Sequence, residues 1–191
     1  YNGKKIAEEM MGTKDFANGD MTTTMIQTNK GKTILIEHNV YTYRPYNRLF
    51  QLTGTEGFAN KYPVEGFTLM DKNLPEGFLA EGQHLNVHGF VPKDVRDKIL
   101  DEYLHPIAKE IEDKAKEVGG HGGMDFIMDY RLIYCLHNGL PLDEDVYDAA
   151  EWSCIGDLTR ASVENHGMPV KMPDFTRGDW NKVNGYKHAM K

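Results

Sequence analysis

A histidine flanked on each side by two glycines is the feature of this sequence best suited to chemistry. Residues 119–125 read Gly-Gly-His-Gly-Gly-Met-Asp, with His121 between the glycine pairs. Glycines let the backbone approach another molecule and leave the imidazole uncovered, and N–H groups at a helix start favour anionic or hydroxyl oxygens. The run also fits a tight connection between two predicted helices, in which Asp125 supplies a favourable first-turn charge. The pattern alone leaves both interpretations open.

A segment rich in tyrosine and arginine is the second candidate. Residues 41–48 read Tyr-Thr-Tyr-Arg-Pro-Tyr-Asn-Arg and connect two predicted strands. Tyr43, Arg44 and Tyr46 are its candidate binding residues. A tyrosine ring offers an apolar face to a sugar, while hydroxyl and guanidinium groups make directed hydrogen bonds. We favour sugar binding over the alternative, which is a strand end with a proline turn and exposed aromatic side chains.

The remaining histidines and cysteines predict no further site. His84 and His88 lie four residues apart, but in a Gly-rich stretch rather than a helix, so we interpret them as structural or exposed. No third ligand accompanies His121 and Asp125, and we predict no metal site. The two cysteines are interpreted as buried free thiols. The sequence has no G-x-G-x-x-G turn after a predicted strand, so a dinucleotide phosphate site is expected elsewhere.

The composition is that of an ordinary globular protein. The 191 residues are 40% hydrophobic and 27% charged, and the formal net charge is −7 at pH 7. An acidic chain lacks the basic face that nucleic-acid binding requires. No apolar run approaches the roughly 20 residues of a membrane-spanning helix. We therefore expect one domain over residues 1–191, with no nucleic-acid partner and no membrane span.

The first half of the chain predicts antiparallel strands. Residues 20–28 and 32–41 flank the turn signal Asn29-Lys30-Gly31, which predicts a hairpin. Further strands are expected at residues 47–53, 58–62 and 66–71. The short connections indicate antiparallel pairing. Polar and apolar side chains mix on both faces of the first strand, which indicates that helices or a second copy of the chain cover its second face.

The second half predicts three helical stretches. Residues 93–118 carry charged residues at helical spacing, and Pro106 breaks or kinks this run. Residues 124–137 precede the stop signal Asn138-Gly139, and residues 144–165 form the third helix. Strands followed by helices are typical of the α+β class. We predict a mainly antiparallel open sheet with helices packed on one face.

Several of these motifs together resemble a family of sugar enzymes. The chain resembles the C-terminal domain of the Gfo/Idh/MocA oxidoreductases, and among them glycoside hydrolase family 109, the NAD-dependent α-N-acetylgalactosaminidases. The resemblance covers nearly the whole chain and is carried by residues 121–126 (HGGMDF), 130–132 (YRL), 138–143 (NGLPLD), 146–153 (VYDAAEWS), 44–46 (RPY) and 54–57 (GTEG). It implies that Tyr46 is a substrate-binding tyrosine with Arg44 beside it, and that His121 lies near the sugar pocket.

The resemblance also implies a cofactor and partners. In such enzymes NAD oxidises the sugar at C3, elimination expels the aglycone, water adds and the ketone is reduced again, a mechanism that needs no carboxylate pair. NAD is held mainly by an N-terminal Rossmann domain, and the sheet often packs against a second subunit. This chain opens at Tyr1 without a methionine. We expect that the Rossmann domain precedes it, that NAD contacts lie there, and that the chain alone is inactive.

Two other functions remain open from the sequence. One is a sugar or cyclitol dehydrogenase of the same superfamily, with net hydride transfer to NAD. The other is a non-catalytic domain that dimerises through its sheet or binds glycan. Relatives of the glycosidase type are often exported, so a bacterial periplasm is the expected compartment, and otherwise the cytoplasm.

Overall fold

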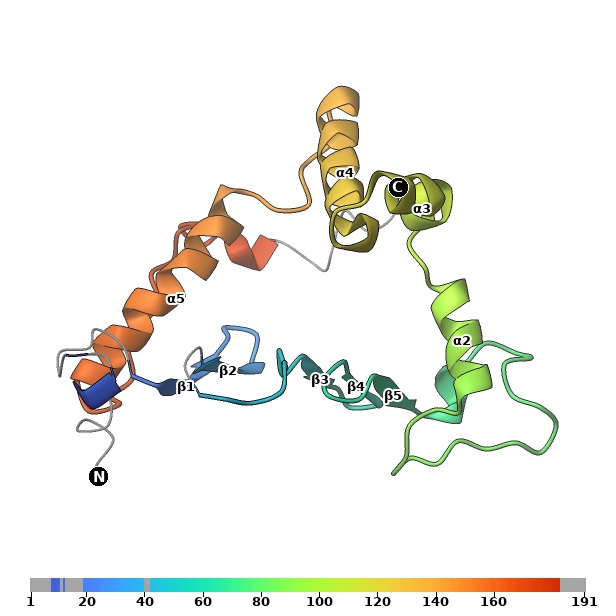
Figure 1. Ribbon diagram of the computed structural model, residues 1–191, viewed down its shortest axis with the longest axis horizontal. Coiled ribbons are helices and arrows are strands. Elements are labelled where there is room, and N and C mark those ends of the chain that lie inside the picture. The colour runs from blue at the N-terminus through green and yellow to red at the C-terminus, as the bar shows by residue number, and fades with distance from the viewer. Residues whose placement is uncertain (1–7, 11, 13–18, 40–41, 183–191) are drawn as a thin grey trace. The chain divides into compact units, whose positions relative to one another are not determined.

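The chain divides into two compact units, and its strands precede its long helices. A computed structural model describes residues 8–10, 12, 19–39 and 42–182 (Figure 1). The first unit is Tyr1–Pro92 and holds the strands, whereas the second is Lys93–Lys191 and holds helices α2 to α5. The predicted α+β class with antiparallel strands is confirmed. A single domain over residues 1–191, with its helices on one face of the sheet, stays a prediction.

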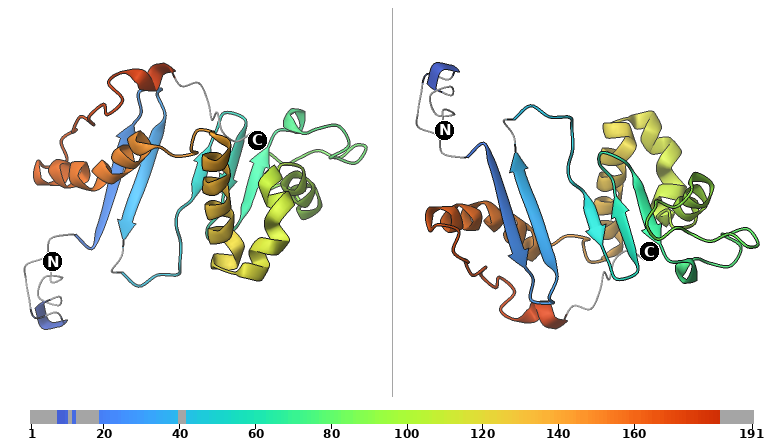
Figure 2. Two further views of the ribbon diagram at one scale, coloured as in Figure 1. Left: turned by 90° about the horizontal axis from the view of Figure 1, so that it is seen from above. Right: turned by 90° about the horizontal axis from the view of Figure 1, so that it is seen from below.

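The predicted hairpin is confirmed at the start of the first unit. Strands β1 (Met21–Gln27) and β2 (Thr33–Asn39) pair antiparallel, with Met21 opposite Asn39 and Gln27 opposite Thr33 (Figure 2). The turn closes because the Gly31 N–H donates to the Thr28 carbonyl at 3.0 Å. Along β1, half-buried and exposed side chains alternate, as expected for a strand whose successive side chains point to opposite faces of the sheet.

The remaining strands form a second sheet instead of extending the hairpin. Strands β3 (Gln51–Thr53), β4 (Gly57–Asn60) and β5 (Gly66–Leu69) pair antiparallel in that order. The predicted third strand at residues 47–53 was therefore too long, and the expected single sheet is two sheets. The cause is local. Asn47 accepts the Leu49 N–H at 2.7 Å and Leu49 has φ 47°, so the backbone turns where the strand was expected to continue.

The long connection after β5 is held by a carboxylate. Asp71, in the 3₁₀ turn η1 (Asp71–Asn73), contacts His84 Nδ1 at 2.8 Å and accepts the Leu85 N–H at 2.8 Å. These two hydrogen bonds, first with His84 and then with Leu85, lower the pKa of Asp71. The Val91 N–H donates to the Phe67 carbonyl at 2.8 Å and returns the chain to β5.

The predicted run at residues 93–118 is two helices, broken at the proline. Helix α2 is Lys93–Glu102 and α3 is Pro106–Val118, with Pro106 in the first turn. The His105 side chain accepts the Ile107 N–H at 3.2 Å and thereby caps α3. Proline is tolerated there because a first-turn N–H has no helical acceptor.

The last two helices begin and end at the signals that the sequence contains. Helix α4 (Met124–Asn138) stops at Gly139, whose φ of 63° is left-handed. Helix α5 (Val146–Glu164) begins with a capping box between Asp145 and Asp148. In the ranges that the structure describes, no helix has the length and apolarity to cross a membrane.

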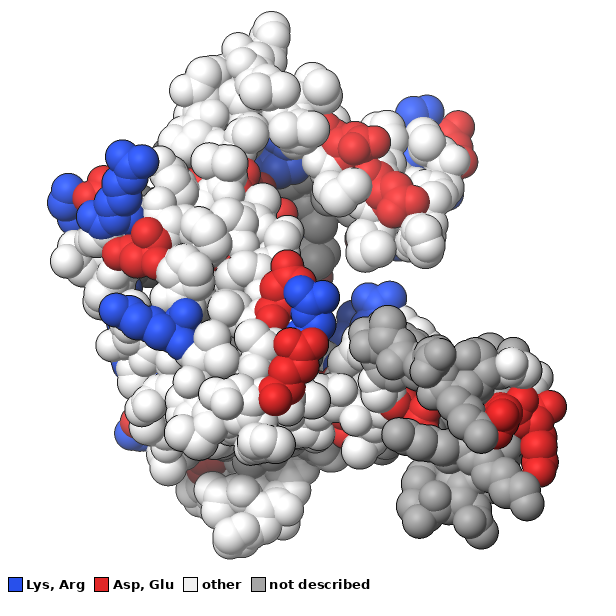
Figure 3. Space-filling view, turned by 90° about the vertical axis from the view of Figure 1, so that its left-hand side faces the viewer, with Lys and Arg blue, Asp and Glu red and all other residues white. Residues whose placement is uncertain are grey.

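Apolar contact between α3 and α4 provides the packing around the glycine-flanked His121. Ile107, Ile111 and Ala115 are buried and recur every four residues along α3, which gives that helix one apolar face. Helix α3 contacts α4 and the short turn η2 (His121–Gly123) between them. On the face in Figure 3, Lys and Arg side chains lie among Asp and Glu side chains.

Candidate functional site

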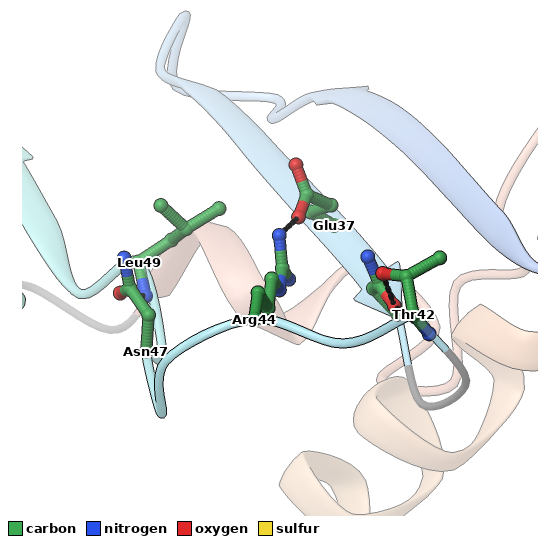
Figure 4. Close-up of polar contacts among 6 residues, drawn as sticks. Glu37, Thr42, Arg44, Asn47 and Leu49 are labelled. Atoms are coloured by element: carbon green, nitrogen blue, oxygen red, sulfur yellow. Dashed lines mark hydrogen bonds and ion pairs between the residues drawn. The ribbon is translucent and has the colours of Figure 1, made fainter.

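In the first unit, Arg44 is held against the hairpin by an ion pair. Its guanidinium donates to the carboxylate of Glu37 in β2, and Figure 4 shows the Arg44 side chain reaching from the connection toward that strand. The Thr42 hydroxyl donates to Asn39 at 2.8 Å and anchors the start of the connection to the end of β2. Tyr41 lies outside the described residues. Arg44 is therefore positioned by β2, with its charge already partly compensated.

Tyr46 has different partners. Its ring meets the Tyr62 ring edge to face, with centroids 5.6 Å apart and an interplanar angle of 86°. The Arg48 Nε–H donates to the Tyr46 hydroxyl oxygen, and the Arg48 Cζ lies 5.5 Å from the centre of that ring. Because the oxygen accepts from Arg48, its own O–H remains able to donate to a ligand. Tyr43, by contrast, is fully exposed.

In the second unit, the glycine-flanked histidine occupies a tight turn between α3 and α4. The turn begins as the Gly119 N–H donates to Ala115 at 3.0 Å, and the Gly123 N–H then donates to the Gly120 carbonyl at 2.8 Å. All five residues from 119 to 123 have positive φ, and His121 has φ 46°. For a non-glycine residue this left-handed conformation costs roughly 1–2 kcal/mol. Such strain is concentrated at functional sites, so it favours the functional interpretation of His121.

Asp125 holds the imidazole of His121. The Nδ1 atom lies 2.8 Å from one carboxylate oxygen and 3.1 Å from the other. Asp125 stands in the first turn of α4, four residues after His121, where a negative charge is also favoured by the helix dipole. The imidazole is 77% exposed, and its Nε2 atom faces away from Asp125. The two interpretations of the turn are therefore compatible, because a tight helix connection also presents a histidine.

His121 borders an open hollow of about 490 Å³ between α3, η2 and α4. The apolar residues of its wall are Ile107, Ala108, Met124, Ile127 and Met128. The polar residues of its wall are His105, Glu112, His121, Arg131 and Asp143. Apolar side chains with directed polar groups among them are typical of a site for a small-molecule ligand.

Arg131 is fixed within this wall by a two-pronged ion pair. Its Nε and Nη2 atoms each donate to an oxygen of Asp143 at 2.9 Å, and the Arg131 side chain is only 11% exposed. The hydrogen bonds that the Arg131 guanidinium donates to Asp143 raise its pKa, so it stays charged. Asp143 is the first of three consecutive acidic residues before α5. Of these, Asp145 caps α5, whereas Asp143 pairs with Arg131.

The structure places the four predicted site residues in two groups. Tyr43, Arg44 and Tyr46 belong to the first unit, and His121 to the second. Within the first unit, Arg44 and Tyr46 use separate partners and do not form one cluster. The role of each as a substrate-binding residue stays a prediction.

Sequence reasoning missed the side chains that hold the candidates. Asp125 was visible as a carboxylate four residues after His121, and a histidine–carboxylate pair at that spacing is a usable signal. The contact of Arg48 with Tyr46 had no comparable signal. His84, interpreted as structural, does pair with Asp71. Across the described ranges, no group of three or more His, Cys, Asp or Glu side chains is arranged to hold a metal ion.

The chain belongs to glycosyl hydrolase family 109. The family's sequence model, described as "Glycosyl hydrolase 109, C-terminal domain", matches residues 1–182. The expected family is therefore confirmed.

Curated relatives extend well beyond this chain. It is 56% identical over 190 residues to glycosyl hydrolase family 109 protein 1 of Bacteroides fragilis, covering 98% of this chain and 41% of that protein. It is 55% identical to protein 1 of Bacteroides thetaiotaomicron, with 98% of this chain and 41% of the relative covered. The Porphyromonas gingivalis protein is 57% identical over 176 residues, 92% of this chain and 38% of the relative. The chain thus spans about two fifths of the length of these relatives.

Proposed function

We propose that the full-length protein is an NAD-dependent glycosidase acting on α-N-acetylgalactosaminides, and that this chain supplies residues that bind its sugar. Membership of glycosyl hydrolase family 109 over residues 1–182 is the observation that carries the hydrolase assignment. The character of the candidate residues supports a sugar ligand. Tyrosine rings, an arginine and a histidine, set beside apolar side chains, are the groups that bind uncharged polyols.

The proposed reaction proceeds by oxidation, elimination, addition of water and reduction. NAD would supply the reversible removal of hydride from the sugar. The described residues of this chain do not fit the cofactor's diphosphate. Its glycine-rich run joins helix α3 to α4, whereas the dinucleotide fingerprint joins a strand to a helix. We therefore assign NAD to a dinucleotide-binding domain of the full-length protein and expect calorimetry to detect no saturable NAD binding by this chain.

The residues of this chain bind and orient the sugar in this proposal. The Tyr46 hydroxyl, which already accepts from Arg48, donates its own hydrogen to a sugar oxygen. The Arg44 guanidinium donates to a second oxygen, and Tyr43 offers an exposed ring. In the second unit, His121 offers Nε2, the ring nitrogen that faces away from Asp125, as a hydrogen-bond acceptor for a sugar hydroxyl.

The test replaces Tyr46 or His121 with alanine in the full-length protein. We expect each change to lower kcat/KM for an α-N-acetylgalactosaminide by about tenfold or more, since a lost directed hydrogen bond costs roughly 1–3 kcal/mol. Tyr103→Ala is the matched control for tyrosine, because Tyr46 and Tyr103 are both 67% exposed. His137→Ala, another exposed histidine, is the control for His121.

The outcomes separate the possible functions. Thermal unfolding of each variant reports whether the fold is intact. Near-normal kinetics in folded Tyr46→Ala and His121→Ala proteins would remove both residues from the site. Sugar release without net NADH supports the glycosidase. Stoichiometric NADH accumulation with a free sugar would instead indicate a dehydrogenase, and no turnover with measurable glycan binding would indicate a binding domain.

We also propose that the protein self-associates through its sheet. Met25 in β1 lies opposite Leu35 in β2, and both side chains are exposed. Covering such an apolar pair is favourable in water. Sedimentation of the full-length protein tests this, and a monomer at high concentration would contradict it.

A further inference from the structure

We infer that Asp125 is a positioning residue that keeps His121 in the tautomer with Nδ1 protonated, so that Nε2 is presented to the ligand as a hydrogen-bond acceptor. The identity of that ligand as a sugar rests on the proposed function. The tautomer and the orientation of the ring follow from contacts within the second unit.

The contact geometry determines where the proton lies. Both carboxylate oxygens of Asp125 are within 3.1 Å of His121 Nδ1. An ionised carboxylate only accepts hydrogen bonds, so Nδ1 must carry the hydrogen. In a neutral imidazole the other nitrogen, Nε2, then has a free lone pair. Asp125 therefore selects an acceptor at the exposed edge of the ring.

The turn is shaped to allow this contact. A side chain at Gly120 would place its Cβ only 2.9 Å from Asp125 Oδ2, so the carboxylate occupies space that the glycine leaves open. His121 itself adopts φ 46°, at a position where glycine would be less strained. A strained non-glycine residue at this position is expected when its side chain, here an imidazole, has a functional role.

The surroundings of the ring favour a directed hydrogen bond. His121 shares the wall of the hollow with Met124 and Met128, whose thioether sulfurs are weak acceptors, and with the carboxylate of Glu112. Arg131 lies in the same wall with its guanidinium paired with Asp143. A hydroxyl entering beside the methionines can therefore donate to Nε2. Fixing the ring in advance avoids the loss of side-chain freedom on binding.

The first measurement needs no substrate. In the full-length protein labelled with ¹⁵N-histidine, the signal that disappears in His121→Asn is that of His121. For the neutral ring we expect ¹⁵N shifts of the Nδ1-protonated tautomer. In Asp125→Asn we expect a shift toward the Nε2-protonated form, because the asparagine N–H₂ group can donate to Nδ1. Asp129→Asn, the same change one turn further along α4 at an exposed position, should leave the wild-type tautomer unchanged.

The second measurement is kinetic. Asp125→Asn should lower kcat for the α-N-acetylgalactosaminide by about tenfold, a loss in the range expected for one directed hydrogen bond. Asp129→Asn should retain wild-type kcat. A wild-type Nε2-protonated ring, or an Asp125→Asn variant with an unchanged tautomer, would overturn the inference whether or not the protein is a glycosidase. A changed tautomer with unchanged kcat would overturn the positioning role. If the protein cleaves no glycoside, the proposed function fails, and the tautomer measurement still tests the inference about Asp125.

Discussion

The close approach of α3 and α4 at Gly123 predicts an asymmetry between two neighbouring glycines. Both Gly122 and Gly123 have positive φ, at 73° and 98°. A Cβ atom at Gly122 would meet nothing within 4 Å, whereas at Gly123 it would lie 2.7 Å from the carbonyl carbon of Ala115 in α3. The same substitution by alanine therefore separates backbone strain from steric overlap.

The expected magnitudes follow from these two effects. Alanine in a left-handed conformation costs roughly 1–2 kcal/mol. Replacing glycine with alanine also lowers the conformational entropy of the unfolded chain, which offsets about 0.4–1 kcal/mol of this cost. Gly122→Ala should thus lower the free energy of unfolding by about 1 kcal/mol. At Gly123 the obstacle is helix backbone, which cannot rotate aside, so α3 and α4 must separate. Overpacking of this kind adds roughly 1–3 kcal/mol, giving about 2–4 kcal/mol for Gly123→Ala.

The assay is urea unfolding followed by circular dichroism on wild type and both variants. Where the slope of unfolding free energy against urea concentration is the same for the three proteins, the shift in midpoint gives the change in the free energy of unfolding. We expect Gly123→Ala to be less stable than Gly122→Ala by at least about 1 kcal/mol, the lower limit of the overpacking cost. Equal stabilities would refute the helix–helix contact at Gly123.

Two further predictions concern ion pairs in the two units. Asp143→Asn should destabilise the protein by about 1–3 kcal/mol in the same assay, because the half of the pair that remains, Arg131, is only 11% exposed; an unchanged midpoint would count against the pair. The pKa of Asp71 is lowered by hydrogen bonds from His84 and Leu85, so this contact stabilises the connection above the ordinary aspartate pKa. That stabilisation is lost as the pH falls through the pKa of Asp71 in the folded protein. The chemical shift of the Leu85 amide proton should follow the ionisation of Asp71 and change at a pH below the ordinary aspartate pKa. A midpoint at or above the ordinary pKa would contradict the contact.

Local signals in the sequence were sufficient for most element boundaries. Pro106 separates α2 from α3 because it lacks an N–H and fits a first turn. Gly139 ends α4 because a left-handed residue closes a helix at little cost in glycine. Each is a property of one residue and its neighbours, and it needs no knowledge of the rest of the fold.

The features that sequence reasoning missed depend on partners rather than on residue type. The expected strand at residues 47–53 begins only at Gln51, because a side chain of Asn47 competes for the backbone of Leu49. Arg131 pairs with Asp143 and not with its acidic neighbours Glu144 or Asp145, because the path of the chain after Gly139 brings Asp143 to the guanidinium. Side-chain pairing across a connection is set by three-dimensional geometry, which spacing alone does not determine.

The bidentate ion pair between Arg131 and Asp143 has a consequence for ligand binding. Asp143 stands two residues before the cap of α5, so its ion pair with Arg131 holds the segment joining α4 to α5 at the wall of the hollow. A phosphate or carboxylate entering there would compete for the guanidinium and loosen that segment, whereas a neutral molecule offers no rival charge. An acidic ligand would therefore have to displace Asp143 from Arg131, whereas an uncharged ligand leaves this ion pair intact.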